Sequence, residues 1–394
     1  MNTAGNRHRD RETPEELPGL RLIVAGGGTG GHLFPGIAVA DVIRGRLPKS
    51  RVLFVTTGRP IETRVLSRTD YETVEIAAAG FKGVGLQAKM RALVKVPAGF
   101  AASFAIFWRF RPDAVIGMGA YSAAPVILAA WAARIFRAVH EQNRIAGMTN
   151  RLLAPFANRI YVSFPDTRIG RCPGKIRYTG NPIRREIGRE TGETGAPEDG
   201  RKFCVLVAGG SQGAHQINTA IIAALPGLKS PETLRFIHQT GMADLEAVRQ
   251  GYAGAGIEAS VEAFFDDMAA CYAAADFTIC RAGATSVAEV AAAGIPAVFI
   301  PYPYAADNHQ YHNAKALEDA GAAEVVPQEA ADGRLLAGRI NYYAGERGVR
   351  MQMQERMRNF ARPNAARAIA EDILSCLGAR GAGRGPGPSG DTSG

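Results

Sequence analysis

The chain has 394 residues, more than one hydrophobic core usually supports, so two domains are expected. Hydrophobic residues make up 46% and charged residues 21%, as in a soluble globular protein, and five cysteines without CxxC spacing exclude a disulfide framework. The net charge of +9 favours an anionic partner: a nucleic acid, an anionic membrane surface or a phosphate-bearing ligand.

Both ends of the chain are polar. Residues 1–18 contain no apolar stretch of the kind that a secretory signal requires. We expect a disordered leader over 1–18 and a disordered tail over 379–394.

The first element is an apolar run over residues 20–24, which continues into the sequence VAGGGTGGH ending at His32. Consecutive glycines between a strand and a helix let the backbone turn sharply and direct N–H groups at an anion. A second copy, VAGGSQGAH over 207–215, shares six of its nine residues with the first and also follows an apolar run. The repeat predicts two related strand–loop–helix domains, each with a phosphate-handling loop.

A helix is predicted over 37–47 and a strand over 52–56. In a dinucleotide-binding fold an acidic residue should end this second strand and hold the ribose hydroxyls. The strand ends instead in Thr56, Thr57 and Gly58, which argues against an NAD-dependent dehydrogenase.

Residues 81–111 combine cations with a largely apolar stretch over 96–108, which is too short to span a bilayer. Such a segment suits an anionic membrane interface, with cations on the headgroups and aromatic rings inserted. A core helix with solvated basic ends fits equally well, and both interpretations stay open because one helix can have both faces. The cations are Lys82, Lys89, Arg91, Lys95, Arg109 and Arg111.

Residues 114–133 form an uncharged run of membrane-spanning length. Gly117, Gly119 and Pro125 divide it, which favours a buried strand over 114–118, a loop with Tyr121 and an alanine-rich helix. We therefore predict an α/β element here and no membrane span.

A strand over 138–140 precedes Glu141, Gln142 and Asn143. Ligands of open α/β sheets bind beyond the carboxyl ends of the strands. We therefore expect Thr29 to His32, Tyr121 and these three residues to face one crevice.

Strands over 159–164 and 175–179 complete the first domain, which we assign to 19–181. A polar segment up to residue 200 is predicted to link the domains. Arg184, at its start, either reaches a phosphate or is a solvated charge.

The second domain, over 182–361, repeats the alternation with strands at 203–207, 234–238, 257–261, 277–280 and 297–300. The sequence RAGATSVAE over 281–289 places Thr285 and Ser286 at a helix N-terminus, where they can hold a diphosphate, and Glu289 where it can accept hydrogen bonds from a ribose. Polar residues over 307–310 suit sugar hydroxyls. A last helix, at about 362–378, is expected to cross back to the first domain.

These segments together resemble the MurG family of inverting glycosyltransferases. The resemblance covers about 20–377 and rests on eight motifs in order: GGGTGGHLFPG, GMGAYSAAP, HEQN, TGNPIR, GGSQGAHQIN, FFDDMAACYAAAD, CRAGATSVAEVAAAG and DNHQYHNA. It implies a GT-B fold, with two Rossmann-like domains whose parallel sheets face each other across a cleft. It also implies transfer of N-acetylglucosamine (GlcNAc) from UDP-GlcNAc to the 4-hydroxyl of undecaprenyl-pyrophosphoryl-MurNAc-pentapeptide in peptidoglycan synthesis, by a peripheral enzyme at the cytoplasmic face of the bacterial plasma membrane.

The resemblance places UDP-GlcNAc mainly in the second domain and the lipid acceptor against the first. It implies that Ser211 and Arg184 contact the diphosphate, Phe265 contacts the uracil through its backbone and Glu289 contacts the ribose. Gln310 would bind the GlcNAc hydroxyls. The full implied binding set is Thr29, Gly30, Gly31, Tyr121, Asn143, Arg184, Ser211, Gln212, Gly213, Phe265, Ala284, Thr285, Ser286, Val287, Ala288, Glu289 and Gln310.

The acceptor hydroxyl is a poor nucleophile and needs a base to take its proton. His32, with an ordinary pKa near 6.5, is the first candidate, although it can instead merely hydrogen-bond its loop. Glu141 is the second, orienting the imidazole or the acceptor. No protein-bound metal or other cofactor is predicted, because helix N-termini and Arg184 can stabilise departing UDP. Mg²⁺ associated with the diphosphates stays open.

Two rival functions remain. A UDP-GlcNAc 2-epimerase would bind the same nucleotide sugar but would have no use for the basic-apolar segment 81–111. A nucleic-acid-binding protein is disfavoured, because the cations are spread along the chain and no recognition motif is present, so no nucleic acid is expected as a partner. Other cell-wall synthesis proteins remain open as partners.

Overall fold

The structure is a computed structural model that describes residues 19–76, 86–187, 201–210 and 212–382, and the side chains of 86–97 and 380–382 are not described. The predicted leader, Lys82, Ser211 and residues 383–394 of the predicted tail lie outside this part of the chain, as do the side chains of Lys89, Arg91 and Lys95.

The N-terminal half forms a doubly wound parallel sheet of seven strands in the order β3-β2-β1-β4-β5-β6-β7. Because β1 alternates its buried side chains, Leu22 and Val24 face one helix layer while Ile23 faces the other. The strands are β1 (Arg21–Ala25), β2 (Arg51–Thr56), β3 (Glu72–Glu75), β4 (Ala114–Gly117), β5 (Phe136–Glu141), β6 (Arg159–Val162) and β7 (Ile176–Tyr178).

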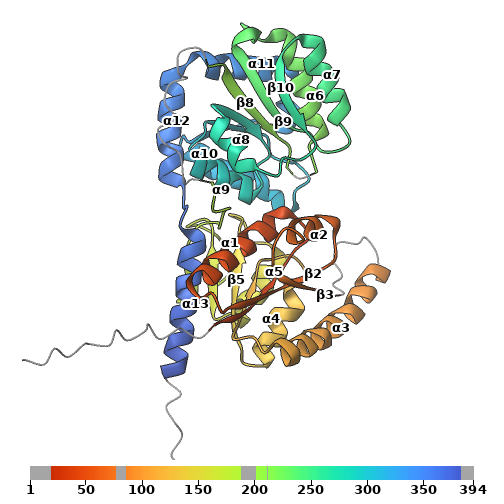
Figure 1. The fold of residues 1–394 in the computed structure, drawn as a ribbon, viewed down its shortest axis with the longest axis vertical. Helices are drawn as coiled ribbons and strands as arrows, with labels where there is room; N and C mark the ends of the chain where they lie inside the picture. Colours follow the sequence, from red (N-terminus) through yellow and green to blue (C-terminus); the bar gives the residue numbers. More distant parts are fainter. Residues whose placement is uncertain (1–18, 77–85, 188–200, 211, 383–394) are drawn as a thin grey trace, which may run out of the picture.

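Helices cover both faces of this sheet. One face packs against α1 and α13, and the other packs against α3, α4 and α5 (Figure 1). The helices of this half are α1 (Gly30–Arg46), α2 (Pro60–Leu66), α3 (Leu86–Phe110), α4 (Ala123–Ala132) and α5 (Met148–Leu153), with the 3₁₀ turn η1 (Ala154–Phe156).

The second half repeats the architecture with six parallel strands in the order β10-β9-β8-β11-β12-β13. Its strands are β8 (Phe203–Ala208), β9 (Leu234–Gln239), β10 (Glu258–Glu262), β11 (Phe277–Cys280), β12 (Ala297–Phe299) and β13 (Ala323–Val325). Its helices are α6 (His215–Ala224), α7 (Leu245–Ala255), α8 (Met268–Ala274), α9 (Ala284–Ala293), α10 (His309–Asp319), α11 (Gly333–Gly345) and α12 (Arg347–Phe360), with 3₁₀ turns η2 (Leu225–Gly227), η3 (Pro231–Thr233), η4 (Ala306–Asn308) and η5 (Gln328–Ala330).

All strands predicted from the sequence are present, with ends shifted by a few residues. The prediction missed two edge strands, β3 and β13. β3 has the sequence ETVE and is mostly exposed, and β13 has three residues, so neither shows the apolar run that marks a buried parallel strand. The uncharged run over 114–133 is β4, a loop and α4, and within the described residues no helix has both the length and the apolarity to cross a membrane.

The last helix, α13 (Ala365–Ala382), packs along the first half beside α1 (Figure 1). Its Asp372 accepts hydrogen bonds from Arg159 Nε at 3.0 Å and from the Tyr161 hydroxyl at 2.9 Å. The helix continues four residues past the predicted end at 378, so residues 379–382 are helical and do not belong to the tail.

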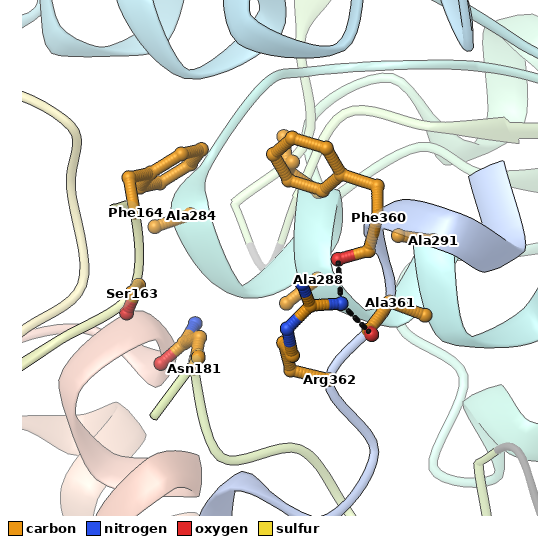
Figure 2. Close-up of a pocket in the computed structure, with 11 residues that line it drawn as sticks. Ser163, Phe164, Asn181, Ala284, Ala288, Ala291, Phe360, Ala361 and Arg362 are labelled. Atoms are coloured by element: carbon orange, nitrogen blue, oxygen red, sulfur yellow. Dashed lines mark hydrogen bonds between the residues drawn. The ribbon is translucent and has the colours of Figure 1, made fainter. Parts of the chain in front are cut away.

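The chain crosses between its halves at two places that touch. Gly180 follows β7 with a φ of +86°, and a Cβ built on it would lie 2.3 Å from the Cβ of Arg362, which precedes α13. The Arg362 guanidinium donates to the carbonyls of Asn359 and Ala361 at the end of α12. Together with Phe360 these crossings border a cavity of about 20 Å³ (Figure 2).

Replacement of Gly180 by alanine should therefore cost more stability than replacement of a glycine that only has a positive φ. Gly174→Ala is the matched control, because Gly174 has a φ of +76° and no atom within 4 Å of its built Cβ. We expect about 1–2 kcal/mol for the control and at least ~1 kcal/mol more for Gly180→Ala, from overlap with Arg362. Urea unfolding of both variants measures the difference, and equal losses would contradict the contact.

Candidate active site

Two helix N-termini from different halves of the chain meet beyond the sheets. α1 begins after Thr29 and α9 begins after Gly283, and neither N-terminus has a side-chain cap. The Thr285 hydroxyl, in the first turn of α9, donates to the Gly31 carbonyl at 3.1 Å. Because both helix ends carry positive partial charge and N–H groups without intrahelical partners, their junction is suited to an anion.

The Gly31 carbonyl is available to Thr285 because of Pro35. In a regular helix the N–H of residue 35 would donate to the carbonyl of residue 31, but proline has no N–H. Pro35 lies inside α1, so the carbonyl keeps an acceptor site for the other half of the chain.

His32 lies in the first turn of α1, between Thr29 and the loop after β4. Its Nδ1 is 3.0 Å from the Thr29 hydroxyl, and its Nε2 would lie 3.1 Å from a Cβ built on Gly119. Burial, with a smaller contribution from nearby His309, lowers the pKa of His32 to about 4. The imidazole is therefore neutral at pH 7, and when Nδ1–H donates to Thr29, Nε2 keeps the lone pair that a base needs.

Glu141 is buried at the end of β5, and its carboxylate accepts four hydrogen bonds. Its Oε1 accepts from the Asn143 backbone N–H and amide, and its Oε2 accepts from Gly147 N–H and Asn150. Burial raises the pKa of this carboxyl, and the hydrogen bonds oppose the rise. Among the described residues Glu141 has no hydrogen bond to His32; it fixes Asn143 and the loop that follows.

Arg184 and Glu289 bind each other. The guanidinium Nε is 2.9 Å from one carboxylate oxygen, and Nη2 is 3.2 Å from the other, which also accepts from Tyr272. The cation lies 4.5 Å from the ring centroid of Phe34 on α1. A ribose that reaches Glu289 must therefore share this carboxylate with Arg184 and Tyr272.

The glycine loop of the second half is joined to the loop after β10 by Gln239, a residue that the sequence analysis did not select. Its Nε2 donates to Gly210 O at 2.9 Å and its Oε1 accepts from Phe265 N–H at 3.1 Å. Gln239 ends β9, so the rule that ligands bind at the carboxyl ends of strands would have found it. The Phe265 backbone N–H is therefore already engaged by Gln239.

Gln212 and Gly213 lie in this loop at the start of α6. A Cβ on Gly213 would lie 1.9 Å from Thr240 O, so only glycine fits there. Ser286, Val287 and Ala288 lie in the first turns of α9. The Val287 side chain is buried in the core, and its backbone N–H donates to Gly283 O at 2.9 Å, so Val287 supports the helix start.

Gln310 opens α10, where its Oε1 accepts from Tyr302 N–H at 2.9 Å. The preceding Asp307 and Asn308 both have a φ near +50°, an uncommon conformation for residues other than glycine. Asp307 lies 3.1 Å from Arg151 of α5. Tyr121 lies partly buried in the loop before α4.

Glu62 is a buried carboxylate that the sequence analysis did not select. It accepts from Gly28 N–H in the first glycine loop, and from the N–H groups of Thr57 and Arg59 at 2.9 Å. A Cβ on Gly27 would lie 2.0 Å from its Oε1. Glu62 thus shapes the glycine loop, and it lies six residues beyond Thr56, the end of β2, where the sequence analysis looked for a ribose-binding acid. Within the described ranges no group of three or more His, Cys, Asp and Glu is arranged to hold a metal.

Two family models match the chain: the glycosyltransferase family 28 N-terminal domain over residues 22–162 and the glycosyltransferase family 28 C-terminal domain over 204–371. The chain belongs to glycosyltransferase family 28. It is therefore a glycosyltransferase, and its two parallel-sheet halves form the predicted GT-B fold.

Relatives within family 28 confirm the resemblance to MurG. Proteins named UDP-N-acetylglucosamine–N-acetylmuramyl-(pentapeptide) pyrophosphoryl-undecaprenol N-acetylglucosamine transferase are 42% identical in Citrifermentans bemidjiense and 44% identical in Geobacter sulfurreducens. Each alignment covers 90% of this chain, with 99% of the first relative and 98% of the second. The crystal structure of Acinetobacter baumannii MurG has a TM-score of 0.71 and 31% identity, covering 90% of this chain and 99% of that chain.

An epimerase shares the architecture but little sequence. The putative UDP-N-acetylglucosamine 2-epimerase from Listeria monocytogenes has a TM-score of 0.66 at 11% identity, covering 92% of this chain and 98% of that chain. This similarity shows the fold alone, whereas membership of family 28 favours transfer over epimerisation.

Proposed function

We propose that this protein transfers GlcNAc from UDP-GlcNAc to the 4-hydroxyl of undecaprenyl-pyrophosphoryl-MurNAc-pentapeptide, with inversion at the anomeric carbon, in peptidoglycan synthesis. The observation that carries the proposal is the junction of the α1 and α9 N-termini beside neutral His32. The reaction joins two substrates that each carry a diphosphate, and the junction supplies one helix N-terminus to each. The names of the relatives support the choice of substrates.

In the proposed reaction His32 Nε2 accepts the proton of the acceptor 4-hydroxyl. The hydroxyl oxygen attacks the anomeric carbon from the face opposite UDP, and the bond from this carbon to the diphosphate oxygen breaks with its electron pair going to UDP. The α9 N-terminus and Arg184 stabilise the charge on departing UDP, so the proposal needs no protein-bound metal. Bound diphosphates would raise the pKa of His32 from about 4 toward the working pH and make it a stronger base.

The direct test supplies labelled UDP-GlcNAc and the lipid-linked muramyl-pentapeptide, and follows labelled disaccharide lipid, UDP and free ManNAc together. We expect label in the lipid and one UDP released per transfer. ManNAc without lipid product would overturn the proposal in favour of the epimerase.

His32→Ala should lower kcat by about 10²–10⁴-fold while the affinity for UDP changes by no more than about twofold. His215→Ala is the control, since His215 has the matching position in the second glycine loop, is exposed and lies 2.8 Å from Asp244. The base is active when deprotonated, so kcat/KM of the wild type should fall as pH drops through about 4, below the ordinary histidine value. Parallel losses of kcat and UDP affinity in His32→Ala would contradict the assignment.

We further propose that the protein docks peripherally on the cytoplasmic face of the plasma membrane through α3. Phe107 and Phe110 of α3 are buried against the sheet, while Trp108 is 80% and Phe104 39% exposed. The helix thus has the core face that one interpretation of segment 81–111 expected, and its exposed aromatic face supports the proposal of an interfacial role. α3 lies at the outer end of the first half with α4 beside it, away from the second half (Figure 1).

The double variant Phe104→Ser, Trp108→Ser should bind vesicles of anionic phospholipid at least about tenfold more weakly, because two inserted aromatic side chains are lost. Met351→Ser is the control, because Met351 is an exposed apolar side chain on α12 of the second half, and this variant should bind as the wild type does. Vesicle sedimentation measures this, and unchanged binding by the double variant would rule out α3 as the docking surface.

A further inference from the structure

Asn313 of α10 is fully buried between the two halves of the chain. Its Oδ1 accepts from Arg144 N–H at 3.0 Å, and its Nδ2 donates to Asn143 Oδ1 at 3.1 Å and to Ala282 O at 3.3 Å. Two of these partners belong to the loop after β5 in the first half, and the third belongs to the turn before α9. Both amide hydrogens are used, so the side chain has one defined orientation.

On the first half, Asn313 completes the support of Asn143. The Asn143 side-chain amide donates to Glu141 at 3.1 Å, while its oxygen accepts from Asn313. The side chain is thus held from both ends, once from each half of the chain. These two bonds fix the directions in which the other amide hydrogen and the other oxygen lone pair of Asn143 point.

On the second half, Asn313 fixes two elements of the proposed donor site. Ala282 immediately precedes Gly283, the N-cap of α9, and α10 itself carries Gln310 one turn before Asn313. One amide on α10 therefore bonds both the Asn143 side chain and the turn before α9.

Ion pairs also connect α10 to the first half, but they are weaker candidates for this role. Arg151 lies 3.1 Å from Asp307 and Arg144 lies 3.8 Å from Asp319, and three of these four side chains are about half exposed. Exposed ion pairs contribute little and are screened by salt. A buried amide costs more to break, because each lost partner leaves a polar group unsatisfied.

We propose that Asn313 is a positioning residue for the transfer reaction: it aligns the donor-binding helices α9 and α10 with the Asn143 loop when the two halves close. The inference rests on the proposed function. It predicts that Asn313 contributes to kcat and to closure, and contributes little to the affinity of the second half for UDP.

Asn313→Asp tests this, because aspartate keeps the side-chain volume and an acceptor for Arg144 but directs a carboxylate oxygen at Asn143 Oδ1 and Ala282 O. We expect kcat/KM to fall at least about thirtyfold, mainly through kcat, with UDP affinity within about threefold of the wild type. Asn341→Asp is the control: Asn341 also bonds one backbone N–H, of Lys229, and one carbonyl, of Gly227, all within the second half. It should lose stability without this loss of kcat. Asn313→Ser, which keeps one hydroxyl donor, replaces the aspartate variant if that fails to fold and should show a smaller loss.

A second readout does not depend on the reaction. Small-angle X-ray scattering with saturating UDP should show a compact wild type and Asn341→Asp, and a more open Asn313→Asp. Equal compaction of wild type and Asn313→Asp, or transfer within about threefold of the wild type, would overturn the inference. If the wild type transfers no GlcNAc, the proposed function fails, and the scattering still decides whether Asn313 joins the two halves.

Discussion

The contact at the centre of the proposed active site joins two helix N-termini: the Thr285 hydroxyl of the second half donates to the Gly31 carbonyl of the first. The described strands of the two halves belong to two separate sheets, so the relative position of the halves depends on side chains at the cleft and on the two chain crossings. Two helix N-termini brought together carry like partial charges, and a hydroxyl that joins a carbonyl at one end to the first turn of the other offsets part of this repulsion. An anion bound between them would offset more of it, so ligand binding and closure are expected to favour each other.

Buried carboxylates shape the loops around this contact by accepting several N–H bonds each. Glu62 holds the first glycine loop and Glu141 holds the Asn143 loop, whereas Glu289 holds Arg184. A buried carboxylate is costly unless its oxygens are hydrogen-bonded, and once satisfied it sets the positions of all its donors. The sheets therefore supply the strand ends, and the carboxylates set the conformations of the loops that follow them.

The sequence predicted the fold well, because parallel strands buried on both faces appear as apolar runs and the glycine loops mark where helices begin. It also placed His32 and Glu141 at one crevice, since strand ends in a parallel sheet share an edge, and the resemblance to the MurG family brought Thr285 to the same cleft. It could not predict which of them would touch. Asn313 and Asn143 are 170 positions apart, and the bonds of Glu141 point into its own loop because of the local turn after β5. Such partners are set by tertiary packing, for which the chain carries no periodic signal.

The internal repeat shows how far a motif by itself determines chemistry. His32 and His215 end the same glycine sequence, yet His32 is partly buried between Thr29 and Gly119 while the His215 side chain is 78% exposed. The backbone differs as well. In the second copy Asn218 N–H donates to Ala214 O at 2.9 Å. In the first copy Pro35 stands at the equivalent position and has no N–H, so the Gly31 carbonyl lacks this bond. In the second loop the first-turn carbonyl is thus bonded within its own helix. In the first loop the Gly31 carbonyl instead accepts from Thr285, and the neutral imidazole of His32 lies beside it. The glycines are common to both copies, so they cannot explain the difference. Pro35 and the contact with the second half make the first copy the candidate catalytic loop.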